Sequence, residues 1–217
     1  MSCAPIALTC GEPAGVGLEI AEKAWSALKD DLPFFLIADP AHLPGSVPHQ
    51  LLQSPQDAIE VMPNAMPVLP HPFAAERTPG TTHPDNAEGV IDVIAHAVDL
   101  AMSDEASAIC TLPIHKKALK DGADFPYPGH TEYLADLGGV ENVVMMLASD
   151  ILRVVPTTIH IPLADVPSAL TPELLVETIR ITAKGLQTQF GIPNQRIAVA
   201  GLNPHAGEGG AMGHEDA

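Results

Sequence analysis

The chain has 217 residues, 46% of them hydrophobic, which suits one large α/β domain or two smaller lobes around a hydrophobic core. Ten Lys and Arg against 27 Asp and Glu give a formal net charge of −17, which repels nucleic acids and anionic lipid surfaces. No apolar run approaches about 18 residues, and the amino terminus lacks a signal-peptide pattern. We therefore expect a cytoplasmic protein with neither a nucleic-acid partner nor a membrane partner.

Short β-branched or apolar runs alternate with helical periodicity along the chain, which is typical of βαβ units in an α/β fold. In the first part we expect strands at 6–10, 34–38 and 108–112, and helices at 17–28 and, capped by Asp85, at about 85–102. The proline-rich stretch 40–84 is expected to be an irregular excursion with short strands. The predicted domains are a first α/β lobe at 1–125 and a second at 126–217.

In the second part, strands are expected at 143–148 and 152–155, joined by a tight turn at Ser149 and Asp150. Thr171 followed by a proline predicts a capped helix that runs to about Phe190. The runs 157–160 and 197–200 are read as two further strands, which end near His160 and His205.

Residues 11–19, GEPAGVGLE, directly follow the first predicted strand. They look like a phosphate-binding turn, but they have neither the G-x-G-x-x-G spacing nor a terminal Lys-Ser/Thr. The other interpretation is a tight turn that lets the backbone pass close to another group. The sequence leaves both open.

Two further loops carry residues that suit an oxyanion. Lys116 and Lys117 follow a predicted strand and either hold a phosphate or carboxylate or are simply solvated. His130 and Thr131 open a short predicted helix ending near Leu137, where side chains and the helix dipole favour an anion, although Thr131 also suits a simple cap.

His160 and His205 are candidates for one shared metal, because ligands collect at the carboxyl ends of strands in open α/β sheets. The competing interpretation is a pair of hydrogen-bonded histidines. A catalytic zinc normally has three protein ligands, and only two convincing ones occur here. His214, a partner subunit or additional sequence could supply the third, and Asn203 and Glu208 lie near His205 as possible accessory residues.

Taken together, these motifs resemble the 4-hydroxythreonine-4-phosphate dehydrogenase family of pyridoxal phosphate biosynthesis. The matching pieces are GEPAGVGLE at 11–19, TLPIHKKAL at 111–119, GHTEYLA at 129–135, LRVVPTTIHIPL at 152–163 and GLNPHAGEGGAMGHED at 201–216. The resemblance implies a two-lobed α/β/α fold of the isocitrate/isopropylmalate dehydrogenase-like type, with the second lobe incomplete. It also implies a homodimer with a shared active site.

By the same resemblance, His130 and Thr131 bind a phosphorylated substrate, and His160 and His205 hold a divalent metal such as zinc, cobalt or magnesium. The implied reaction is oxidation of 4-phosphooxy-L-threonine with NAD or NADP, followed by decarboxylation. Lys116, Asn203 and Glu208 are accessory candidates. The cofactor-binding residues and the third metal histidine are expected mostly beyond residue 217.

The chain departs from the family pattern in several places. Members are typically about half as long again, and Glu12, His115 and His214 stand where the family usually has other residues. One alternative is a related threonate or erythronate 4-phosphate dehydrogenase. Another is a non-catalytic binding or dimerisation module.

Overall fold

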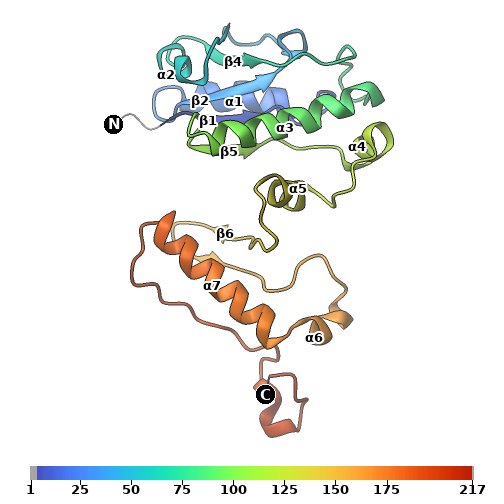
Figure 1. Ribbon diagram of the computed structural model, residues 1–217, viewed down its shortest axis with the longest axis vertical. Coiled ribbons are helices and arrows are strands. Elements are labelled where there is room, and N and C mark those ends of the chain that lie inside the picture. The colour runs from blue at the N-terminus through green and yellow to red at the C-terminus, as the bar shows by residue number, and fades with distance from the viewer. Residues whose placement is uncertain (1–3, 217) are drawn as a thin grey trace. The chain divides into compact units, whose positions relative to one another are not determined.

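The computed structural model describes residues 4–216, which form two compact units separated between Glu141 and Asn142 (Figure 1). This boundary falls later than the one expected after residue 125. The difference arises because α5 (His130–Leu137) packs against α3 (Ala87–Met102) of the first unit. Within 4–216, none of the helices combines the length and the apolar character needed to cross a membrane.

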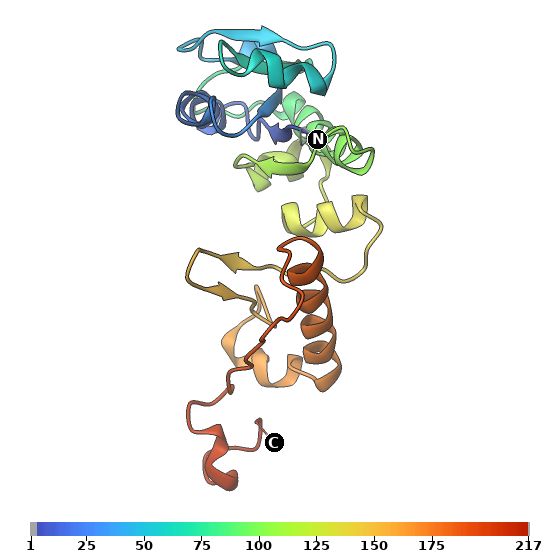
Figure 2. The same cartoon turned by 90° about the vertical axis from the view of Figure 1, so that its left-hand side faces the viewer.

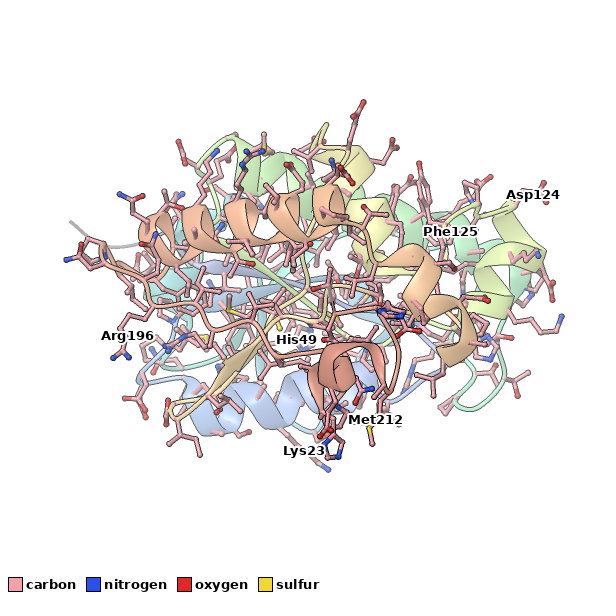
Figure 3. The ribbon with its side chains drawn as sticks, turned by 90° about the horizontal axis from the view of Figure 1, so that it is seen from below. Lys23, His49, Asp124, Phe125, Arg196 and Met212 are labelled. Atoms are coloured by element: carbon pink, nitrogen blue, oxygen red, sulfur yellow. The ribbon has the colours of Figure 1, made fainter. Side chains whose placement is uncertain are left out.

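The first unit is built on a parallel sheet with the strand order β3-β4-β2-β1-β5. The register pairs Ile6 of β1 with Phe34 of β2 and with Ala108 of β5. The helices α1 and α3 cover opposite faces of this sheet (Figures 2 and 3). The strands are β1 (Ile6–Thr9), β2 (Phe34–Ala38), β3 (His49–Leu51), β4 (Met66–Pro70) and β5 (Ala108–Thr111). The arrangement confirms the expected α/β class.

The core lies between the sheet and its two covering helices. Every residue of β2 is buried, as expected for a strand of a parallel sheet that is covered on both faces. The helix α1 (Gly17–Leu28) contributes Leu18 and Trp25, and the Trp25 Nε1 donates a hydrogen bond to the Met62 carbonyl at 2.8 Å. From the other face α3 contributes Val93, Ala97 and Leu100. Val90 and Ile94 of the same helix instead belong to a second apolar cluster, with Leu119 of α4 (Lys116–Ala123) and Tyr133 of α5.

Most elements predicted for the first unit are confirmed, with one correction. The stretch 40–84 contains the short strands expected of it, β3 and β4, together with α2 (Ala58–Val61), and β4 pairs with β2 through Leu36 and Val68. Asp85 is not the cap of α3: it lies in a 3-10 turn at Pro84–Asn86, where its N–H is accepted by the His83 ring.

The second unit contains the hairpin of β6 (Leu147–Ala148) and β7 (Arg153–Val154), α6 (Val166–Ala169) and α7 (Pro172–Thr188). Thr171 caps α7 as predicted, and its hydroxyl accepts from the Leu174 N–H at 3.2 Å. The prediction of strands at 157–160 and 197–200 was wrong. Neither run pairs with another segment within 4–216, and a strand cannot form without a neighbour to bond its backbone groups.

Candidate active site

The sheet order places a topological switch point beside β1. From β1 the chain moves to β2 on one side and later returns to β5 on the other. Ligands of open α/β sheets bind outside the carboxyl ends of the two strands at such a point. A binding site is therefore expected at the loops that follow β1 and β5, together with the starts of α4 (Lys116–Ala123) and α5.

The glycine-rich loop 11–17 packs on the backbone that follows β5. Gly11 has φ +67°, and a Cβ at this residue would lie 2.4 Å from the Pro113 carbonyl oxygen. The same oxygen accepts a hydrogen bond from the Glu12 N–H at 2.9 Å. These contacts support the tight-turn interpretation of the loop, because the close partner of its glycine is protein backbone.

Arg77, which was not predicted from the sequence, lies outside loop 11–17 and contacts it. Its Nε donates to the Pro13 carbonyl at 2.7 Å, and its Nη2 pairs with Glu19 Oε1 at 2.5 Å. No local pattern marks the residue, because its partners are about sixty positions away in the chain.

The two lysines at the start of α4 have different surroundings. Lys117 is exposed and pairs with Asp121 at 2.5 Å, one turn further along the helix. Lys116 instead reaches towards α5, and its Nζ lies 3.4 Å from the position of a Cβ built on Gly129. Of the two, only Lys116 is placed to act on a ligand at the start of α5.

His130 is the first residue of α5 and is half-buried. Within 4–216, its Nε2 is buried without a hydrogen-bond partner. Burial lowers the pKa of His130, and the positive charge of Lys116 lowers this pKa further. A buried ring nitrogen that lacks a partner next to an ammonium group is a suitable contact for an oxyanion.

The start of α5 also has free backbone donors. Its N-cap is Gly129, which has no side chain to cap the helix, so Thr131 is not the cap. The first N–H groups of a helix have no intrahelical acceptors and attract anions. The backbone therefore adds donors beside His130 and Thr131.

Aromatic packing holds α5 in place. Tyr133 is buried against Phe125, with ring centroids 5.2 Å apart in an edge-to-face arrangement, and against Tyr127 at 5.0 Å. Burial raises the pKa of Tyr133. This cluster orients the helix and so positions His130.

The second unit contains His160 and His205, which were predicted as metal ligands. His160 is exposed, with φ 59°. The His205 Nδ1 lies 3.2 Å from Glu208 Oε1, and both side chains are more than half exposed. Throughout 4–216, no three His, Cys, Asp or Glu side chains converge where they could hold a metal ion. These residues therefore do not form a complete metal site.

Asn203 and Glu208 both contact His205. The Asn203 Oδ1 accepts from the His205 N–H at 2.9 Å, while its Nδ2 donates to the Met212 carbonyl at 3.0 Å. Both accessory candidates therefore shape the loop around His205. His214 packs on Gly210 instead: a Cβ at that glycine would lie 2.2 Å from the His214 ring.

The fold is that of the α/β dehydrogenases of the isocitrate/isopropylmalate dehydrogenase-like type. The pattern of the family described as pyridoxal phosphate biosynthetic protein PdxA matches residues 28–217. The chain belongs to this family.

Individual relatives agree with this assignment. The chain is 59% identical over 211 residues to a 4-hydroxythreonine-4-phosphate dehydrogenase of Ruegeria sp. (strain TM1040), covering 97% of this chain and 65% of the relative. Crystal structures of enzymes with the same name from Burkholderia phymatum and Klebsiella pneumoniae superpose with TM-scores of 0.86 and 0.87, at 32% and 29% identity. The matches cover 100% and 98% of this chain, and 68% of the chain of each of these two relatives. The chain thus spans about two thirds of the length of these relatives.

Proposed function

We propose that the complete protein oxidises 4-phosphooxy-L-threonine with NAD, as part of pyridoxal 5′-phosphate biosynthesis. The secondary alcohol gives a hydride to the nicotinamide and a proton to a base. The product, 2-amino-3-oxo-4-phosphooxybutanoate, then loses carbon dioxide and leaves 3-amino-2-oxopropyl phosphate. Family membership supports this reaction, and the names of the relatives point to the same substrate.

The observation that carries the proposal is the buried Nε2 of His130, which has no protein partner within 4–216 and lies at the uncapped start of α5. We assign the phosphate of the substrate to this position. His130 and Thr131 would donate to its oxygens together with the first backbone N–H groups of α5. Lys116 would add a charge-assisted contact.

For the metal, we propose His160 and His205 as two of the ligands, with the remaining ligand from outside residues 4–216. The two imidazoles suit zinc, cobalt or a similar divalent ion. The NAD-binding residues and a homodimer with a shared site belong to the same proposal, and they rest on the resemblance to the family. Glu208 and Asn203 would hold the His205 ring and loop in place.

A chimera tests the reaction: residues 1–217 of this chain are joined to the remaining third of the Ruegeria relative, and NADH formation is followed. Lys116→Ala is expected to raise KM for 4-phosphooxy-L-threonine roughly 10- to 150-fold, the equivalent of losing about 1.5–3 kcal/mol from a charged hydrogen bond. Lys117→Ala is the matched control and should leave KM within about twofold, because Lys117 pairs with Asp121 at the surface.

Two further readouts separate this function from its alternatives. Lys116→Ala should raise the pKa of His130, measured by NMR titration, since one of the causes that lowers it is removed. A higher kcat/KM for threonate 4-phosphate than for the amino substrate would indicate the related hydroxy-acid enzyme. Equal KM values for both lysine variants would rule out the phosphate position proposed here.

A further inference from the structure

The side chain of His115 caps the start of α4. His115 has an extended backbone, with φ −105° and ψ 93°, and its Nδ1 accepts a hydrogen bond from the Ala118 N–H at 3.1 Å. A ring nitrogen that accepts a hydrogen bond carries no proton, so the cap requires the neutral imidazole with its proton on Nε2. Oxygen-bearing side chains are the usual helix caps. A histidine in this role is therefore a specific feature of this chain.

The rest of α4 is anchored independently of this cap. Leu119 is buried in the apolar cluster that also contains Val90 and Ile94. At the far end of the helix, a Cβ at Gly122 would lie 2.4 Å from the Pro84 carbonyl oxygen, so the two backbones are in close contact. Loss of the cap should therefore loosen the first turn of α4 and leave the remainder of the helix in place. His115 itself is exposed, so its truncation opens no cavity.

Lys116 is the first residue of the turn that His115 caps. Its Nζ lies 3.4 Å from the position of a Cβ built on Gly129, the N-cap of α5. Within 4–216, no ion pair with a carboxylate holds the Lys116 side chain. The backbone of the first turn therefore sets where the ammonium group lies.

We propose that His115 is a positioning residue for Lys116: by capping α4 it holds the first turn so that the Lys116 ammonium stays beside the start of α5. His115 acts through Lys116 and does not contact the substrate. This inference rests on the phosphate position proposed above, and it adds the residue that keeps the cation at that position.

NMR titration of the 217-residue chain tests the positioning without any substrate. His115→Ala is expected to raise the pKa of His130, in the same direction as Lys116→Ala, because the ammonium that lowers this pKa is no longer held beside the ring. His115→Asn is the matched control. It should leave the pKa of His130 unchanged, since the Asn Oδ1 can accept the Ala118 N–H in place of the ring nitrogen.

Kinetics of the chimera described above test the consequence for the substrate. His115→Ala should raise KM for 4-phosphooxy-L-threonine about 3- to 10-fold and leave kcat within about twofold, in line with the typical contribution of an N-cap. In the Lys116→Ala background, the same substitution should change KM by less than about twofold, because the residue that it positions is already absent.

Ser54→Ala controls for the loss of a cap in general. The Ser54 hydroxyl accepts from the Gln56 N–H at 3.2 Å and caps the turn at Pro55–Asp57, which does not carry Lys116. This variant should leave KM within about twofold of the original.

Three results would overturn the inference. One is an unchanged pKa of His130 in His115→Ala. Another is an equal rise in KM from His115→Ala with and without Lys116, which would give the cap a purely structural role. The third is a His115→Asn variant that behaves like His115→Ala. If no chimera forms NADH but the pKa of His130 still follows the cap, the proposed reaction is wrong and the positioning role is supported.

Discussion

Gly11→Ala is expected to destabilise the first unit by roughly 2–5 kcal/mol. Two costs add: about 1–2 kcal/mol for a left-handed backbone with a side chain, and about 1–3 kcal/mol for overpacking. The second arises because the new Cβ would lie 2.4 Å from the Pro113 carbonyl oxygen, and backbone on both sides leaves little room to relax. Urea unfolding measures the loss through the fluorescence of Trp25, the single tryptophan, which is buried in this unit.

Gly45→Ala separates the two costs. Gly45 has φ +77°, but nothing lies within 4 Å of a Cβ at this position. Only the conformational cost of about 1–2 kcal/mol should therefore appear. Equal losses of unfolding free energy for the two variants would show that loop 11–17 does not pack on the Pro113 backbone as described.

Tyr133→Ala is expected to cost about 3–5 kcal/mol of unfolding free energy, in the range of large aromatic truncations in cores. The side chain is buried against Phe125 and Tyr127, and its loss leaves a cavity beneath α5. The start of α5 should loosen as well, so that inorganic phosphate shifts the amide signals of His130 and Thr131 less at any given concentration. Urea unfolding and NMR titration measure the two effects.

Tyr133→Phe is the control for the packing argument. The Tyr133 hydroxyl lies 3.5 Å from the Ile91 carbonyl, at the limit of a hydrogen bond, and most of the contact comes from the ring. This variant should stay within about 1 kcal/mol of the original and keep the phosphate response. A loss as large as that of Tyr133→Ala would mean that the hydroxyl, and not the ring, holds α5.

Local physical chemistry made several elements predictable from sequence. The helix α1 and the strand β2 have the bounds expected from periodicity and from an unbroken apolar run. Thr171 caps α7, because a hydroxyl before a proline satisfies N–H groups only a few residues away. The sequence also located His130 and Thr131 at the start of a short helix. In each case the signal comes from residues that are close together in the sequence.

Where a segment or side chain interacts with residues far along the chain, only the tertiary structure determines which element forms and what each side chain contacts. The proline-containing β4 is a strand because β2 and β3 pair with it, whereas the apolar run 197–200 has no such neighbour within 4–216 and stays irregular. Lys116 and Lys117 are adjacent in sequence, and only the position of α5 separates their roles. Strand pairing and side-chain environment depend on contacts between distant segments. The composition and periodicity of a single segment do not encode such contacts.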